Sequence, residues 1–449
     1  MATPTHRVRP LETPADLPPP ANFYVCYNAM ALSHFGGVRF HLTCKGATVN
    51  RREMCMTYAL EGVMVLDLSR VLAGPFCGMM LADMGAEVLK IEEPAGGDES
   101  RTWPPFVAGE ASGYLSMNRN KRNMTLNLKT PEAQDILKKL VARADILIEN
   151  FRTGTMEAFG LGYDVLHAIN SRLIYCAVSV FGRSGPYKDK AGYEALMQAF
   201  SGVMSITGDP AGPPLRCGVS FLDLGTGMMA AYGVMNALFH RERTGLGQRV
   251  EVSLFETALS LMSYHAVGYL LNGHVPRRQG SGHPMIVPYQ VFRTQDGEMF
   301  IVGSNQRLWT RLCQVLSCAD LLQDRRFGSN MERVEHRDML IPLLQDEIEK
   351  YPTKVLNEML DNAGVPCAPV NTLDHVLSDP QTLARDMIVD IPHPLIPDLK
   401  LLGPPIKLSD TPGDVHMPPP LKGQHTEDVL IDLGYREAEI ETLRERQVI

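Results

Sequence analysis

The stretch GVMVLDLSRVLAGPFCGMMLADMGAEVLKIE, residues 62–92, decides the fold. Its first nine residues form a short apolar run that predicts a strand, and the remainder predicts a turn, a helix and a second strand. This strand–helix–strand order is typical of parallel α/β units. The stretch therefore predicts a parallel sheet that begins near Leu60.

The same alternation continues along the chain. A strand is expected to end at LNLK, residues 126–129, and Thr130 with Pro131 is expected to open an amphipathic helix, PEAQDILKKLVARA. Further strands are predicted in DILIENF (145–151), RLIYCAVSVFG (172–182) and RVEVSLF (249–255). Together these elements indicate an α/β fold whose large domain is Rossmann-like and doubly wound.

Later elements predict a second, smaller domain. Long helices are expected in GMMAAYGVMNALFHRER (227–243) and ETALSLMSYHAVGYLLNG (256–273), before a new pattern starts at Tyr289. There, YQVFRTQDGEMFIVGS predicts a β-hairpin. Helices near 306–319 and 331–350 and short strands in NAGVPCAPV and MIVDIPHP should complete this α+β domain.

The expected division of the chain follows from these elements. It comprises a leader over 1–56, a large domain over 57–255 completed by 415–449, a linker with a glycine loop over 256–288, a small domain over 289–395, and a return linker with C-terminal helices over 396–449. The C-terminal helices should pack back on the large domain.

The leader differs in composition from the rest. Its start, HRVRPLETPADLPPPANF, is rich in proline and predicts disorder. From Met30 it holds three Arg and one Lys before the first acid, Glu53, which is typical of a mitochondrial transit segment. A gene-model artefact or a species-specific tail is an equal alternative, and Met56 is a further candidate start. The expected location is therefore mitochondrial, or otherwise cytoplasmic.

Composition excludes several classes of protein. The net charge of −8 argues against a nucleic-acid binder, which needs a basic face. No apolar run approaches the ~20 residues of a membrane span. The nine cysteines form no C-x-x-C pair, which predicts reduced thiols and no zinc site. We expect no metal.

The strongest candidate for chemistry is a single acid in a nearly neutral stretch. Asp223 lies in VSFLDLGTGMMAAYG, beside a Gly-x-Gly and small residues. This arrangement presents one nucleophilic oxygen to a substrate that must approach the backbone closely. Glu194, 29 residues earlier in AGYEAL, is either a second acid of the site or a helix-terminal charge stabilised by the helix dipole.

Three other stretches are weaker candidates. The turn Arg70–Pro75 follows the first strand, where open α/β sheets bind ligands, but it lacks G-x-G-x-x-G and so disfavours NAD. The basic cluster NRNKR, residues 118–122, is either solvated surface or an anion site. The loop GSGH, with Gly280, Gly282 and His283, is either a simple turn or a lid.

Taken together, these motifs resemble one family. They are similar to class III CoA-transferases, the CaiB/BaiF family, in family order over about residues 58–449. The similar stretches run from RVLAGPF to HRERTGLGQRVEVSL, with GDESR, ADILIENFRTG, FGLGYD and TGDPAGPP between them, and continue with HPMIVPYQVF, GVPCAPV and GQHTEDVL. Within the family, NRNKR and GHPMIVPYQ look most like the mitochondrial branch that exchanges CoA between succinyl-CoA and glutarate.

The resemblance implies a set of site residues. It makes Asp223 the nucleophile, which carries an aspartyl-CoA thioester during turnover, and gives Glu194 an orienting role beside it. It further implies that CoA is held by Arg70, Val71, Leu72, Ala73, Leu126, Asn127, Leu128, Lys129, Asn150, Phe151, Arg152, Ala191, Gly192 and Tyr193. For the remote carboxylate of a dicarboxylic acceptor, the candidates are Arg119 first and Arg70 second, because a guanidinium pairs bidentately with a carboxylate. Backbone groups at Gly225 or in the GSGH loop are candidate oxyanion donors.

Departures from the family pattern limit the substrate. Leu72 stands where formyl-CoA transferases have a glutamine, and GSGH replaces their longer glycine loop, which argues against oxalate or formate. Family members that racemise α-methylacyl-CoA have a histidine where this chain has Tyr193. A phenol with a pKa near ~10 is a poor proton shuttle at neutral pH, so transfer is favoured over racemisation.

The resemblance also implies an interlocked homodimer, acyl-CoA and carboxylic acid substrates, and no metal or redox cofactor. No nucleic acid or membrane partner is expected. The alternatives are a racemase and a non-catalytic CoA-binding protein, and a dehydrogenase is disfavoured by the missing glycine fingerprint.

Overall fold

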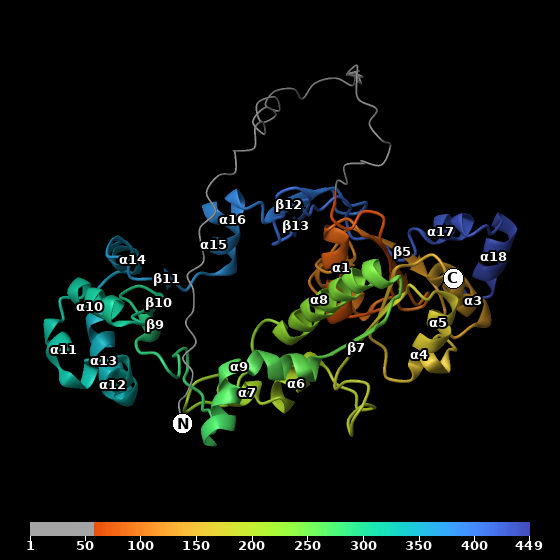
Figure 1. Cartoon of the computed structure of the whole chain (residues 1–449). Helices are drawn as coiled ribbons and strands as arrows, with labels where there is room; N and C mark the ends of the chain where they lie inside the picture. The colour runs from red at the N-terminus through yellow and green to blue at the C-terminus, as the bar shows by residue number, and fades with distance from the viewer. Residues whose placement is uncertain (1–57) are drawn as a thin grey trace, which may run out of the picture. The chain divides into compact units, whose positions relative to one another are not determined.

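Six parallel strands form the central sheet of the computed structural model, which describes residues 58–449 (Figure 1). In sheet order they are β5 (Lys121–Thr125), β2 (Glu87–Glu92), β1 (Met64–Asp67), β6 (Ile146–Glu149), β7 (Ile174–Ser179) and β8 (Arg249–Ser253). Numbered along the chain, this order is 3-2-1-4-5-6, that of the doubly wound fold. The predicted α/β class and parallel sheet are confirmed, and the leader expected over 1–56 lies outside the described residues.

Each face of the sheet is covered by its own helices, because successive strand residues point to opposite sides. Val65 and Ile146 pack on one face against α1 (Ala73–Asp83) and α8 (Phe221–Thr244). Leu66 packs on the other face. That second face is covered by α3 (Pro131–Val141), α4 (Thr155–Ala158), α5 (Tyr163–Ile169), α17 (Thr426–Asp432) and α18 (Glu437–Glu445).

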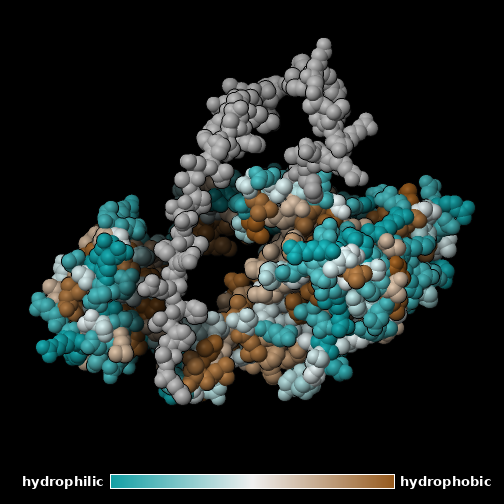
Figure 2. All heavy atoms as spheres, viewed as in Figure 1, coloured by the Kyte–Doolittle hydropathy of each residue, from teal (hydrophilic) through white to brown (hydrophobic). Residues whose placement is uncertain are grey.

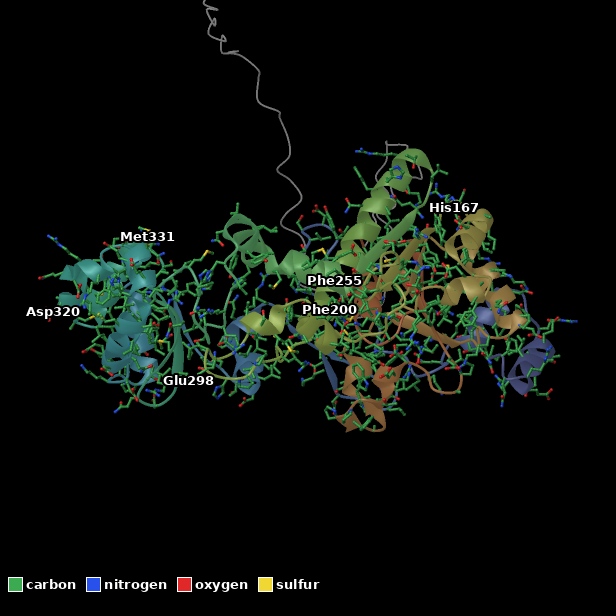
Figure 3. All side chains as sticks on the ribbon, turned by 90° about the horizontal axis from the view of Figure 1, so that it is seen from below. His167, Phe200, Phe255, Glu298, Asp320 and Met331 are labelled. Carbon is green, nitrogen blue, oxygen red and sulfur yellow. The ribbon has the colours of Figure 1, made fainter. Side chains whose placement is uncertain are left out.

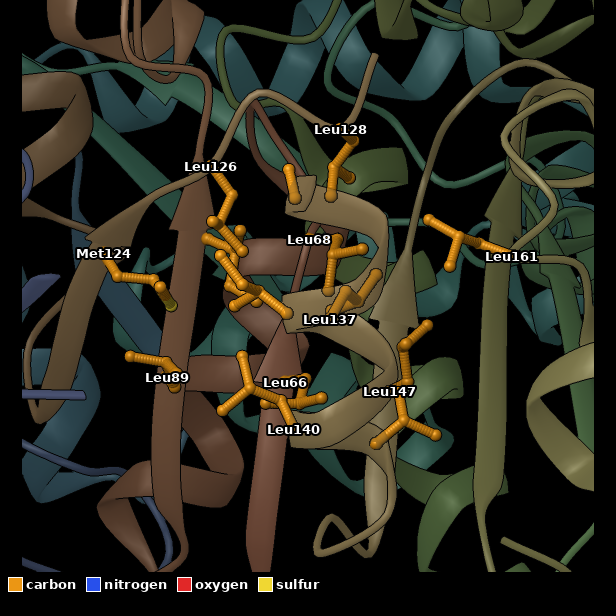
Figure 4. Packing of buried hydrophobic residues seen from close by; sticks show 14 of the residues in the cluster. Leu66, Leu68, Leu89, Met124, Leu126, Leu128, Leu137, Leu140, Leu147 and Leu161 are labelled. Atoms are coloured by element: carbon orange, nitrogen blue, oxygen red, sulfur yellow. The ribbon is translucent and has the colours of Figure 1, made fainter. Parts of the chain in front are cut away.

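The second face forms the larger of the two cores. Figure 4 shows Leu137 and Leu140 of α3, one turn apart, directed at Leu66, Leu89 and Leu147 of three neighbouring strands. Helix α3 begins as predicted: the Thr130 side chain accepts a hydrogen bond from the Ala133 amide, with proline at the first helical position. The C-terminal helices α17 and α18 contribute to this core, so the end of the chain is part of the large domain.

Short elements connect the sheet to its edge loops. They are β3 (Phe106–Val107), β4 (Glu110–Ala111), the 3-10 helix η1 (Glu99–Thr102), and the helices α2 (Ser112–Leu115), α6 (Glu194–Phe200) and α7 (Val203–Ile206). The long helix α9 (Leu254–Asn272) follows β8. Two boundaries differ from the sequence expectation. Strand β5 ends at Thr125, so LNLK follows the strand instead of ending it, and α8 begins at Phe221, so Asp223 lies inside the helix.

The smaller α+β part has its own core around Trp309 and Phe292. Its predicted hairpin is confirmed as the antiparallel pair β9 (Tyr289–Arg293) and β10 (Glu298–Val302). The other elements are β11 (Cys367–Pro369), α10 (Gln306–Val315), α11 (Ala319–Gln323), η2 (Arg325–Phe327), α12 (Asn330–Glu335), α13 (Arg337–Ile348) and α14 (Thr353–Asn362).

A third small cluster follows this part. The chain forms α15 (Leu373–Ser378), α16 (Pro380–Ala384), β12 (Ile388–Ile391) and β13 (Leu399–Leu402). MIVDIPHP is a strand as predicted, but it pairs with β13, and Ile391 packs with Leu115 of α2 instead of with the core around Trp309. None of the helices within residues 58–449 combines the length and the apolar character needed to cross a membrane.

Candidate active site

A cleft opens at the carboxyl edge of the sheet, where the strand order reverses. The loop after β1 leads to α1 on one face, and the loop after β6 leads to α4 and α5 on the other, so the two neighbouring strands diverge here. The cleft spans about 1050 Å³, part of which is open to solvent. Its lining includes Arg70–Ala73, Asn150–Arg152, Ala191–Glu194 and Asp223, four of the five groups that the sequence assigned to the site.

Asp223 lies in the first turn of α8 and faces this cleft. Burial, and secondarily the neighbouring charge of Glu194, raises the pKa of its carboxyl to about 7. The helix dipole favours a carboxylate at this position, but the loss of hydration outweighs it. In the described part of the chain, no cation forms an ion pair with Asp223. Its oxygens are therefore free to react near neutral pH.

Glu194 is fixed beside Asp223 by a short relay of polar groups. It is the first residue of α6, is only 6% exposed, and accepts a hydrogen bond of 2.6 Å from Gln198 Nε2. Gln198 Oε1 in turn accepts from the Cys217 amide, and Arg216 Nε lies 3.8 Å from Glu194 Oε2. Glu194 is thus a helix-terminal charge and also lines the cleft.

The two loops at the switch point are joined to each other. The Arg70 amide donates to Asn150 Oδ1 at 2.8 Å, and Asn150 Nδ2 donates to the Arg70 carbonyl at 2.7 Å. The Arg70 guanidinium lies 5.4 Å from the centre of the Phe151 ring. This double hydrogen bond fixes the distance between the turn after β1 and the loop after β6. The cleft floor is therefore preorganised.

The stretch Leu126–Lys129 does not line this cleft. Leu126 and Leu128 are buried in the core against α3. Asn127 donates to the Gln447 carbonyl, and Lys129 lies on the surface with Glu93. The family resemblance implied that these residues hold CoA, but in the structure their side chains contact the core, Gln447 and Glu93.

Arg119 requires a correction. Its guanidinium is only 4% exposed and donates to both oxygens of Asp83, at 3.0 and 2.7 Å. Lys121 of the same cluster is fully buried and donates to Asp67 at 2.8 Å. Most of the NRNKR cluster is therefore neither solvated surface nor an anion site, because acids distant in sequence already neutralise it. Arg119 is withdrawn as a contact for the acceptor.

The GSGH loop lines a separate cavity of about 520 Å³ with Tyr264 and His265. The Gly280 amide bonds the carbonyl of Gly208, and the His283 ring lies between Tyr264 and Tyr289, with centroids 5.6 and 5.3 Å away. Burial, then His265 and Arg337, lowers the pKa of His283. Neither Gly282 nor its neighbours in this loop line the Asp223 cleft within the described chain.

Sequence reasoning missed a lysine on the rim of the cleft. The Lys190 ammonium lies over the rings of Phe181, Tyr187 and Phe200, 5.1–5.6 Å from their centroids. These rings form one aromatic cluster with Phe255, and Figure 3 labels Phe200 and Phe255 side by side. Lys188 also lines the cleft. The signal was the KDK run directly before AGYE, two cations next to an otherwise neutral stretch.

Comparisons with known proteins identify the family of this chain. The model of CoA-transferase family III matches residues 60–426. The succinyl-CoA:glutarate CoA-transferase of Homo sapiens is 38% identical over 372 residues, which cover 83% of this chain and 85% of that protein. The succinyl-CoA–D-citramalate CoA-transferase of Chloroflexus aurantiacus is 39% identical, covering 87% of this chain and 98% of the relative.

The fold agrees as well. A crystal structure of a CAIB/BAIF family protein from Brucella suis superposes with a TM-score of 0.76 at 36% identity, covering 84% of this chain and 100% of that one. The family model spans both the turn at Arg70 and the acid at position 223. This chain therefore belongs to CoA-transferase family III and is a CoA-transferase.

Proposed function

We propose that this enzyme moves CoA from succinyl-CoA to a dicarboxylic acid such as glutarate, through an aspartyl-CoA thioester on Asp223. The observation that carries the proposal is the Asp223 carboxyl, which has no ion-pair partner within residues 58–449, has a pKa raised to about 7, and lies in a cleft at the switch point of the sheet. A weakly hydrated carboxylate is a better nucleophile than one that is solvated or ion-paired.

The cycle balances as four acyl transfers. The Asp223 carboxylate attacks the donor thioester, which gives a mixed anhydride and releases CoA thiolate. The thiolate attacks the Asp223 carbonyl, which forms aspartyl-CoA and releases succinate. The acceptor carboxylate attacks aspartyl-CoA, forming a second anhydride and CoA thiolate. The thiolate then attacks the acceptor carbonyl, which yields the new thioester and restores Asp223. No step changes an oxidation state, so the proposed cycle needs no redox cofactor.

The substrate class rests on what the relatives share. Those from Homo sapiens and Chloroflexus aurantiacus are named for succinyl-CoA with glutarate and with D-citramalate, at nearly equal identity. Overall similarity thus favours a succinyl-CoA donor and a dicarboxylic acceptor without choosing between the two acids. Arg70 is our candidate for the remote carboxylate, because it lines the cleft and has no ion pair in the described part of the chain.

The test is a quenched reaction. Protein mixed with succinyl-CoA and quenched in acid should carry CoA on the peptide that contains Asp223, and hydroxylamine should remove it. Asp223→Asn should carry none and should lose about 10³-fold or more in kcat. A panel of mono- and dicarboxylates, repeated with Arg70→Gln, should show a selective loss for dicarboxylates. CoA bound at another residue, or wild-type turnover by Asp223→Asn, would refute the proposal.

We also propose that the enzyme is a homodimer. Large apolar side chains are exposed on α8 and α9, including Tyr232 at 69%, Phe239 at 60%, Leu270 at 79% and Leu271 at 81%. Figure 2 shows hydrophobic surface gathered over the middle of the viewed face, where Figure 1 has α6 to α9. A patch of this kind is typical of a subunit interface. Small-angle scattering that gives the mass of a monomer would contradict it.

The proposed location is mitochondrial. Its support is the basic, acid-poor character of residues 30–52. Microscopy of the full chain with a C-terminal tag, compared with a chain that starts at Met56, tests it.

A further inference from the structure

Val71, in the turn that opens the cleft, has an unusual backbone. Its φ is +73°, in the left-handed region that glycine adopts freely and β-branched residues avoid. Such a conformation persists only where surrounding contacts impose it. Val71 is among the residues that line the cleft.

The Val71 backbone contacts Asp98. The Val71 amide donates to Asp98 Oδ1 at 3.1 Å, across 27 residues of sequence. On the other side of the peptide, Arg70 is held by its two hydrogen bonds with Asn150. Between these two fixed points, the turn has to bend at Val71.

Asp98 is itself held rigidly. Its side chain is fully buried, and Oδ2 lies 2.9 Å from the equally buried Lys90 ammonium. Lys90 also donates to the Ser69 carbonyl at 2.8 Å, at the start of the same turn. The Asp98 amide donates to Glu92 Oε2 at 2.7 Å, and Ser100 donates to Asp98 Oδ1 from both its amide and its hydroxyl. Rotation of Asp98 would break this whole network.

We propose that Asp98 is a positioning residue: it holds Val71 in the left-handed conformation and so keeps the Arg70–Ala73 turn in the shape that accepts CoA. The inference rests on the proposed function, since it takes this cleft as the CoA site. Asp98 is fully buried and acts on the turn through the Val71 amide and, by way of Lys90, the Ser69 carbonyl.

A double-mutant cycle tests it, with CoA itself titrated by calorimetry. Asp98→Ala should weaken CoA binding about tenfold or more, because the turn relaxes to an ordinary β-branched conformation. Val71→Gly alone should weaken CoA binding by less than Asp98→Ala does, because it removes a residue that lines the cleft but leaves the native φ free of strain. In the double variant, Val71→Gly should recover most of the affinity lost with Asp98→Ala. A merely structural role for Asp98 predicts no such rescue.

Asp83→Ala is the matched control. Asp83 is likewise buried and paired with a cation, Arg119, but does not touch the turn. Asp83→Ala should lower thermal stability, should leave the dissociation constant of CoA within about threefold, and should not be rescued by Val71→Gly. If Asp98→Ala proves insoluble, the same comparison is made with Lys90→Met added, which removes the unpaired ammonium.

Wild-type CoA affinity in Asp98→Ala, or no recovery in the double variant, overturns the inference. These outcomes are independent of the Asp223 test, because calorimetry with CoA measures binding without turnover. Failure to trap aspartyl-CoA, together with the predicted rescue, would reject the proposed chemistry and leave the role of Asp98 intact.

Discussion

Acids at the same edge of the sheet have opposite environments. Asp67 and Asp98, near the ends of β1 and β2, each pair with a buried lysine. Burial would raise the pKa of Asp98, but Lys90 and the amides of Ser100 and Val71 outweigh it and lower the pKa to about 2. Asp223 has no such partner in the described chain, and burial raises its pKa to about 7.

The two kinds of acid therefore have different roles in the protein. A paired carboxylate stays ionised, stabilises the fold and is chemically inert. An unpaired one destabilises the fold and retains its reactivity. The protein places the inert acids under the turn that shapes the cleft and the reactive acid in the cleft, so one region provides rigidity and the other a nucleophile.

The largest expected effect comes from breaking a pair. Lys121→Met should lower the free energy of unfolding by about 3–5 kcal/mol, because Asp67 is left as an uncompensated buried charge. Arg122→Met is the matched control, since Arg122 and Glu87 are partly exposed and their separation is 3.3 Å; it should cost less than about 1 kcal/mol. Urea unfolding measures both, and equal losses would contradict the comparison.

A smaller change in the free energy of unfolding, of opposite sign, is expected when Asp223 is replaced. Because its folded-state pKa is raised, the folded protein binds more protons than the unfolded chain, and stability from this group is lost as pH rises through about 7. At pH ~8, Asp223→Asn should therefore be more stable than wild type by about 1–2 kcal/mol. At low pH, where wild-type Asp223 is neutral, the gain should disappear. Thermal unfolding that finds Asp223→Asn destabilised at both pH values would reject this account.

The smallest effect concerns the pH dependence of turnover. The nucleophile has to be ionised, so kcat/KM should rise with pH through a midpoint near 7. Glu194→Gln removes a neighbouring negative charge and should therefore move the midpoint to lower pH. This shift should be smaller than the pKa shift that burial causes at Asp223, because burial is the larger of the two causes. Glu99→Gln, another acid lining the cleft, should leave the midpoint in place. A midpoint unmoved by Glu194→Gln would remove Glu194 from this role.

Local signals predicted much of the fold and part of the site. The apolar runs predicted the parallel strands, and Thr130 with Pro131 predicted the start of α3. The family resemblance assigned Arg70 and Asn150 to the same ligand, and the structure places both in one cleft. The predictions that failed concerned residues whose partners are distant in sequence. Nothing near Arg119 in sequence indicates that Asp83 buries it, and nothing near Val71 indicates Asp98.

The sequence by itself determined the order of strands and helices, the family and the identity of the candidate nucleophile, because hydrophobic periodicity and motif order are local properties of the chain. Only the tertiary structure decided which charges are neutralised, which acid stays unpaired, and how the turn at Val71 is held. Those outcomes depend on burial and on contacts between residues tens of positions apart, which no local pattern encodes.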